Sequence, residues 1–108
     1  MWLARRLSDV PAVAEPRYRS APNVATGYCN EATFLLNKKT GRYYRLDDVG
    51  TELWTLLRRS PSLSVREIVR QLSEVYEVAP EGIATDVATL IATLINYAVI
   101  EVDSARRE

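Results

Sequence analysis

The stretch FLLNKKTGRYYRLDDVGTELWTLL, residues 34–57, constrains the fold more than any other part of the chain. Its KKTG turn contains Gly41, which tolerates the positive φ of a tight hairpin, so a strand over Ala32–Asn37 is predicted to pair with one over Arg42–Leu46. Two acids, Asp47-Asp48, follow at once and suit the N-terminus of a helix. This stretch therefore predicts a β-hairpin that runs directly into a helix.

Three helices are predicted after this hairpin. The first spans about Asp48–Arg58, with Asp47 or Asp48 as its N-cap. The second begins at Ser64-Val65-Arg66-Glu67, a capping box in which the serine and glutamate side chains satisfy backbone amides left free at a helix end. The third spans about residues 80–97, because Pro80 suits a first helical turn.

The third predicted helix has more apolar surface than one face requires. A regular core stripe consists of Ile83, Val87, Leu90, Ile91 and Leu94. Further apolar side chains widen that stripe: Ala84, Ala88, Ile95, Tyr97 and Ala98. Either the helix is buried between two others, or one edge of the stripe lines a groove against the Arg42–Leu46 strand, where a partner segment docks.

The predicted fold class is α+β and winged-helix-like, with a three-stranded antiparallel sheet followed by three helices. The remaining strand of the sheet is Val24–Tyr28, which a turn at Asn30-Glu31 joins to the hairpin. Alternation along Arg42–Leu46 places Tyr44 and Leu46 on one face and Tyr43 and Arg45 on the other. A short closing strand is expected over Val99–Val102.

A length of 108 residues fits one domain, predicted over residues 23–102. Residues 1–22 contain three prolines and no sustained period, which favours a flexible arm. In a competing interpretation, Trp2, Leu3 and Leu7 dock on a partner or a second copy, and the sequence leaves this open. Residues 103–108 form a tail.

The composition argues against several classes of function. The chain has no histidine, the commonest general base and a frequent zinc ligand, and it has no glycine-rich phosphate loop. Its single cysteine, Cys29, is interpreted as a small residue facing the core from a strand, and it favours a cytoplasmic setting. We therefore predict no enzyme, no cofactor and no metal site.

No membrane span or secretory signal is predicted either. The longest apolar run, Ala84–Ile100, is interrupted by polar residues, and no apolar segment follows Arg5-Arg6.

A winged-helix DNA-binding regulator is the alternative function. Bases do predominate in residues 23–46, but acids outnumber them from Asp47 onward. A recognition helix needs basic or amide side chains, whereas the third helix has no Lys or Arg and the second alternates bases with acids. Nucleic acid is therefore not the expected partner. A third interpretation is a dimerisation module that associates through an exposed strand edge.

The order of motifs over residues 23–102 resembles the PqqD-like domains. The resemblance is carried by TGRYYRLDDVGTELW, SVREIVRQLSEVYEVAPE and ATDVATLIATLINYAVIEV. Two positions depart from that family's pattern: Asp47 stands where Asn is frequent, and Ala98 where Gly is common. Among these domains, separate chains of this size are similar to those of lasso-peptide pathways, in which another protein, a protease, cuts the leader.

The resemblance implies a leader-peptide recognition element of ribosomally made, modified peptides, acting as a non-catalytic adaptor that presents the leader to a processing enzyme. In that family the leader adds as a strand to the third strand and lies against the third helix. The implied peptide-binding residues are Tyr43, Tyr44, Arg45, Leu46, Asp86, Leu90 and Thr93.

These residues also have competing structural roles. Leu46 is expected to contribute to the core, and for Tyr44 the two roles are balanced. Asp86 is either solvated or hydrogen-bonded to the strand, while Arg45, with Arg42, is expected to pair with acids of the leader. The whole interpretation requires that the outer edge of Arg42–Leu46 be left unpaired.

Overall fold

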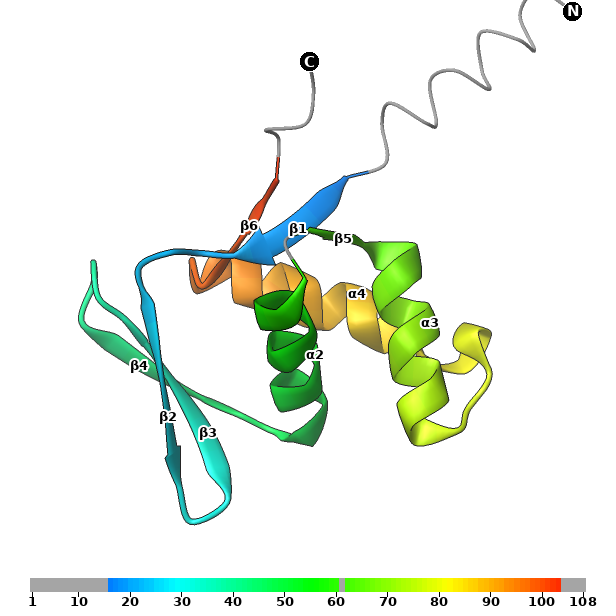
Figure 1. Cartoon of the computed structure of the whole chain (residues 1–108), viewed down its shortest axis with the longest axis horizontal. Coiled ribbons are helices and arrows are strands. Elements are labelled where there is room, and N and C mark those ends of the chain that lie inside the picture. Colours follow the sequence, from blue (N-terminus) through cyan, green and yellow to red (C-terminus); the bar gives the residue numbers. More distant parts are fainter. Residues whose placement is uncertain (1–15, 61, 104–108) are drawn as a thin grey trace, which may run out of the picture.

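The described part of the chain, residues 16–60 and 62–103 of the computed structural model, comprises two small antiparallel sheets and three helices (Figure 1). The elements in chain order are β1 (Arg17–Ser20), β2 (Val24–Cys29), β3 (Ala32–Asn37), β4 (Arg42–Leu46), α2 (Asp48–Arg59), β5 (Leu63–Ser64), α3 (Val65–Tyr76), α4 (Pro80–Asn96) and β6 (Ile100–Val102). The strand orders are β2-β3-β4 and β5-β1-β6. The predicted α+β class, with a three-stranded sheet before three helices, is confirmed.

The β2-β3-β4 sheet is built by two tight turns. Asn30 and Glu31 both have positive φ, 51° and 66°, and close the β2–β3 turn. Gly41 has φ 75° and donates its amide to the Asn37 carbonyl at 2.7 Å, which closes the β3–β4 turn as predicted. The register pairs Leu35 with Tyr44. The predicted hairpin is therefore present.

Helix α2 begins as soon as β4 ends, because Asp47 caps it. The Asp47 Oδ1 atom accepts a hydrogen bond from the Gly50 amide at 2.8 Å. Gly50 packs closely against the strand end, since a Cβ atom there would lie 3.2 Å from Asp47 Oδ1 and 3.4 Å from the Leu46 Cβ. The cap and this close approach fix the corner between sheet and helix.

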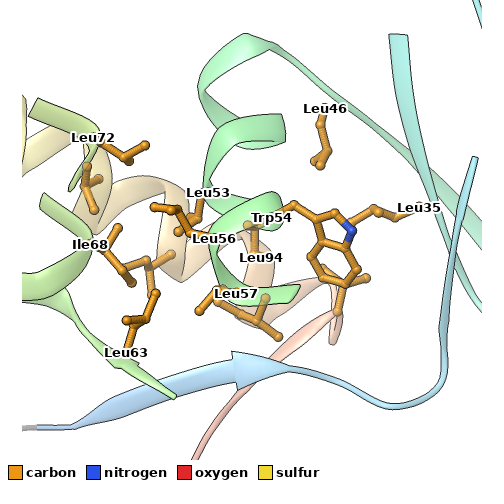
Figure 2. Packing of buried hydrophobic residues seen from close by; sticks show 14 of the residues in the cluster. Leu35, Leu46, Leu53, Trp54, Leu56, Leu57, Leu63, Ile68, Leu72 and Leu94 are labelled. Atoms are coloured by element: carbon orange, nitrogen blue, oxygen red, sulfur yellow. The ribbon is translucent and has the colours of Figure 1, made fainter. Parts of the chain in front are cut away.

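One face of α2 joins the sheet to the other helices (Figure 2). Leu53, Leu56 and Leu57 of α2 are buried in one cluster with Ile68 and Leu72 of α3 and Leu94 of α4. Trp54 projects from the same helix toward Leu35 of β3, and its Nε1 donates to Thr26 Oγ1 of β2 at 3.0 Å. The core therefore runs continuously from the sheet through α2 to α3 and α4.

The second sheet corrects the prediction for the N-terminal arm. The sequence predicted a flexible arm over residues 1–22. Residues 17–20 of that segment instead form β1, which pairs with β5 through Tyr18 and with β6 through Arg19. Both partner strands lie far along the chain, so no local pattern signals the pairing. Residues 1–15, including Trp2, Leu3 and Leu7, and residues 104–108 lie outside the described part.

A second correction concerns Cys29, which is exposed at the end of β2 rather than facing the core. It lies on the opposite face of β2 from Val24 and Thr26, since side chains alternate along a strand. Val24 and Thr26 lie on the face of β2 that is turned toward the core. Cys29 lies on the other face and directly precedes the turn at Asn30, so it is exposed.

No single helix in the described residues is long and apolar enough to cross a membrane. The pair α3 and α4 reaches that length and composition only when both helices are counted together across a bend of 119°.

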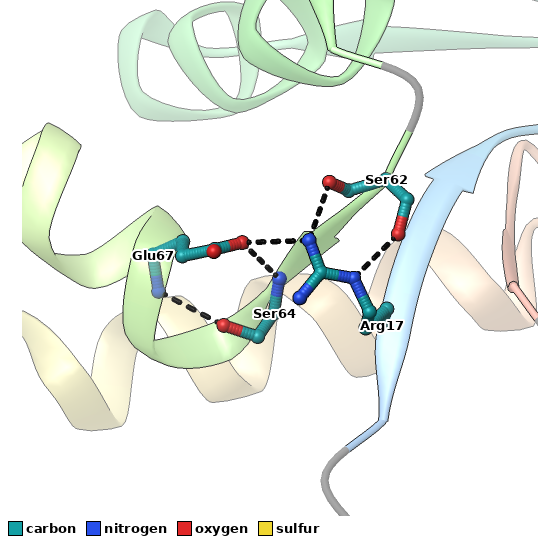
Figure 3. A network of polar contacts seen from close by, with 4 residues as sticks. All are labelled: Arg17, Ser62, Ser64 and Glu67. Carbon is teal, nitrogen blue, oxygen red and sulfur yellow. Dashed lines mark hydrogen bonds and ion pairs between the residues drawn. The ribbon is translucent and has the colours of Figure 1, made fainter. Parts of the chain in front are cut away.

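A polar network ties β1 to the start of α3 (Figure 3). The predicted capping box is present: Ser64 Oγ accepts from the Glu67 amide at 3.2 Å, and Glu67 Oε1 accepts from the Ser64 amide at 3.0 Å. Arg17 adds an ion pair to Glu67 at 3.1 Å and a hydrogen bond to Ser62 Oγ at 2.7 Å. These contacts lower the pKa of Glu67, chiefly through the Ser64 amide, with Arg17 adding to the effect and burial opposing it.

Replacement of Glu67 by glutamine is expected to reduce the dependence of stability on acid pH. Because folding lowers the pKa of Glu67, its charge stabilises the fold above the ordinary value of 4.5, and this contribution disappears as the pH falls through the lowered value. At pH 7, Glu67→Gln should cost about 1 kcal/mol or less, since the charge is partly solvated. Urea unfolding at pH 7 and pH 3 measures both effects.

Glu74→Gln is the matched control, because Glu74 is exposed on the same helix. The destabilisation by Glu67→Gln should shrink toward zero at pH 3, whereas Glu74→Gln should change stability little at either pH. An equal loss in the free energy of unfolding for Glu67→Gln at pH 7 and pH 3 would show that the charge of Glu67 does not stabilise the fold.

Candidate functional site

A cavity of about 650 Å³ opens between the end of β4, the start of α2 and the C-terminal half of α4. We call it the β4–α4 groove. Its lining residues are Glu31, Ala32, Arg45, Leu46, Asp47, Asp48, Val49, Thr51, Leu90, Thr93, Leu94 and Tyr97. Leu46 and Leu94 are buried, whereas Leu90 and Thr93 are half-buried, so the apolar floor merges with the core and its rim reaches solvent.

The strand beside this groove has an unpaired edge. Within the described residues β4 pairs with β3 alone, and β1 pairs with β5 and β6 instead of covering it. An edge strand presents main-chain amides and carbonyls that can pair with another extended segment. Among the described residues, no segment pairs with the outer edge of β4, and Arg45 and Leu46 of the same strand line the groove.

The charges around the groove are mainly negative. Three carboxylates line it, from Glu31, Asp47 and Asp48, against one guanidinium, from Arg45. None of the four takes part in an ion pair within the described part of the chain. Helix α4, whose C-terminal half forms one wall, has no base in its last turn to offset the negative end of its dipole.

The acids at the start of α2 also affect the pKa of Tyr76, at the end of α3. Burial raises the pKa of the Tyr76 hydroxyl, and the nearby carboxylates of Glu52, Asp48 and Asp47 raise it further. Three carboxylates at the start of α2, from Asp47, Asp48 and Glu52, thus lie near enough to Tyr76 to affect its pKa.

Four of the seven residues that the sequence analysis singled out line the groove: Arg45, Leu46, Leu90 and Thr93. The other three do not. Tyr43 is 69% exposed and lies outside the groove, and Asp86 is exposed one turn before Leu90, without a hydrogen bond to the sheet in the described residues. The Tyr44 ring stacks on Tyr97 instead, with centroids 3.9 Å apart and an angle of 13° between the ring planes.

Sequence reasoning missed several lining residues, among them Glu31, Asp48 and Tyr97. Glu31 belongs to a turn and Asp48 to the start of a helix. Each was interpreted only in that local role, so the prediction did not include it among the groove residues. Tyr97 was noted only as part of the wide apolar surface of α4. The sequence signal that could have indicated Tyr97 as a groove residue was its position at the end of the helix predicted to pack against the Tyr-rich strand.

A small α+β domain with an unpaired strand edge beside an apolar groove has the geometry that domains use to bind an extended peptide by strand addition. The sequence itself matches the family described as Coenzyme PQQ synthesis protein D (PqqD) over residues 32–100. The chain belongs to this family, which confirms the resemblance. A search of curated proteins finds no match.

Solved structures show the same fold. TbiB1 in complex with the TbiA(beta) leader peptide is 26% identical, with a TM-score of 0.68, over 77% of this chain and 94% of that one. A lasso peptide synthetase B1 complexed with its leader peptide is 22% identical, with a TM-score of 0.63, over 78% and 96%. The PqqD truncation of Methylobacterium extorquens PqqCD, a stand-alone RiPP recognition element, is 23% identical, with a TM-score of 0.62, over 79% and 88%.

Proposed function

We propose that this protein is a non-catalytic adaptor that binds the leader of a ribosomally synthesised precursor peptide by β-strand addition. The adaptor presents the bound leader to a separate processing enzyme, such as a leader peptidase of a lasso-peptide pathway. The proposed setting is the cytoplasm, in agreement with the lone cysteine. The single observation that carries the proposal is the open edge of β4 beside the β4–α4 groove.

The edge of β4 and the β4–α4 groove contribute differently to peptide recognition. The main chain of β4 offers hydrogen bonds that any extended peptide can make, so it supplies affinity with little sequence preference. The groove between Leu46 and Leu90 supplies selection, because an apolar leader side chain gains most when it leaves water there. The TbiB1 and lasso peptide synthetase B1 structures, which contain leader peptides, support the choice of a leader peptide as the ligand.

Fluorescence polarisation with the labelled leader of the precursor encoded beside this gene tests the function. A dissociation constant in the micromolar range or tighter, about −8 kcal/mol or better, is expected for a paired strand with a few anchored side chains. N-methylation at alternate leader positions should abolish binding in one register and spare it in the other, because a strand turns every second amide toward its neighbour. Absence of binding to the unmodified leader would overturn the proposal.

The acids of the groove favour a leader segment with a basic side chain next to its apolar anchor. This differs from the expectation that Arg45 pairs with leader acids, since Glu31, Asp47 and Asp48 outnumber it at the groove. The double change Glu31→Gln and Asp48→Asn should weaken leader binding about fivefold in 50 mM NaCl, and much less in 500 mM, because salt screens exposed charges.

Glu74→Gln, which removes an exposed acid of α3 away from the groove, is the control for that double change and should leave binding unchanged. Tighter binding by the double variant would show instead that Arg45 dominates and that the leader is acidic there.

The competing functions predict other results. A DNA-binding regulator needs a basic helix face, whereas α4 has no Lys or Arg and the charges at the groove are mainly acidic. A dimerisation module would self-associate through the edge of β4 and would not respond to added leader, because it has no peptide ligand. Size-exclusion chromatography with and without leader, and with duplex DNA, separates the three.

A further inference from the structure

The turn before β4 is linked to the C-terminus of α4 by Asn37, the last residue of β3. Its side chain is 1% exposed. Its Oδ1 accepts hydrogen bonds from Asn23 Nδ2 at 2.9 Å and from the Lys39 and Thr40 amides at 3.0 and 3.3 Å. One side chain thus shapes the turn from which β4 begins.

The other end of the same side chain reaches helix α4. Asn37 Nδ2 donates to the Tyr97 carbonyl at 3.1 Å and to the Ala98 carbonyl at 3.5 Å, at the C-terminus of α4. These carbonyls lie where a helix leaves its last acceptors without helical partners. Ala98 has φ 62°, so the chain turns here in the left-handed conformation that often ends a helix.

A second tie, between Tyr44 and Tyr97, connects the two walls themselves. The Tyr44 ring comes from β4 and the Tyr97 ring from the end of α4, and they stack at 3.9 Å between centroids. Tyr97 lines the groove, whereas Tyr44 does not. Tyr44 directly precedes Arg45 and Leu46, the strand residues that do line it.

We infer that the Asn37 hydrogen bonds and the Tyr44–Tyr97 stack form a clamp that sets the spacing between β4 and α4 and so preorganises the groove for its peptide. The inference rests on the proposed leader binding. Tyr44 acts here as a positioning residue: it holds a wall in place without lining the groove. A preorganised site avoids the cost of ordering its walls during binding, so losing the clamp weakens affinity even in folded protein.

The tyrosine pair provides the test, because replacing the fully buried Asn37 would leave its partners unpaired and unfold the domain. Tyr44→Leu and Tyr97→Leu should each weaken leader binding about tenfold, while Tyr97→Phe, which keeps a ring to stack, should stay within twofold of wild type. The double variant Tyr44→Leu with Tyr97→Leu should bind about as weakly as either single variant, since each already removes the one stack. Tyr28→Leu, which changes a tyrosine 74% exposed on β2, is the control and should bind like wild type.

Two further measurements separate the possible outcomes. The near-ultraviolet circular dichroism of the coupled rings should be lost in both single variants, and urea unfolding should show each variant folded at the binding temperature. Wild-type affinity in a folded Tyr44→Leu variant would overturn the inference, because the clamp would then be only structural or Tyr97 would act by direct contact. Additive losses in the double variant would overturn it too. Failure of wild-type protein to bind leader would instead refute the proposed function.

Discussion

Replacing Leu90 by aspartate is expected to weaken leader binding by about 100-fold or more, equivalent to about 2.7 kcal/mol, while the domain stays folded. Leu90 is half-buried on the rim of the β4–α4 groove and packs against the edge of the core. A carboxylate there would have to lose its hydration when an apolar leader side chain enters, and no base of α4 could pair with it. Fluorescence polarisation with labelled leader measures the effect.

Thr89→Asp is the matched control for this change. Thr89 is the neighbouring residue of α4, exposed and outside the groove, so the substitution adds the same charge to the same helix without entering the site. It should leave the affinity within about twofold of wild type, the small effect usual for an exposed charge outside a binding site. If Leu90→Asp bound leader normally, the groove would not be the binding site, and if it failed to fold, Leu90 would belong to the core.

Trp54→Ala is expected to have the largest effect on stability, a loss of about 3–5 kcal/mol in the free energy of unfolding. Trp54 is 2% exposed, and its indole fills the space between α2 and the β2-β3-β4 sheet (Figure 2). Alanine would leave a cavity there, remove the hydrogen bond to Thr26 Oγ1 and take away the ring beneath the Arg58 guanidinium, 5.6 Å from its centroid. Such a loss is a large share of the stability usual for a small domain.

Urea unfolding followed by far-ultraviolet circular dichroism measures this loss without relying on tryptophan fluorescence. Trp54→Phe keeps one buried aromatic ring but lacks the donor to Thr26 and part of the indole volume, so it shows how much of the loss a single ring can restore. It should cost clearly less than alanine, about 1–2 kcal/mol. A loss below about 1 kcal/mol for Trp54→Ala would mean that the sheet and α2 are held together by other contacts.

The predictions from sequence succeeded where structure depends on near neighbours. The turn at Gly41 and the capping box of Ser64 and Glu67 each involve residues at most a few positions apart, so the chain displays them directly. The start of α2 is similar, although the sequence left Asp47 and Asp48 as alternatives for the N-cap and the structure selects Asp47.

The predictions failed where distant segments decide. Arg17–Ser20 was placed in a flexible arm because its partner strands, β5 and β6, are remote and too short to signal themselves. Cys29 was expected in the core because its residue type is often buried, yet its place at the end of β2, on the face away from the core, exposes it.

The sequence by itself determined the β2-β3-β4 strands, the three helices, their order and the family, because turns, caps and apolar periods involve residues close together in the chain. The tertiary structure alone decided that no described segment pairs with the outer edge of β4 and that Leu90 and Thr93 of α4 line a groove with Arg45 and Leu46. It also decided that Tyr44 stacks on Tyr97 and that Glu31 and Asp48 make the groove acidic. The groove and the Tyr44–Tyr97 stack bring together segments of β4 and α4 that are more than 40 residues apart, and such packing depends on the shape of the whole core.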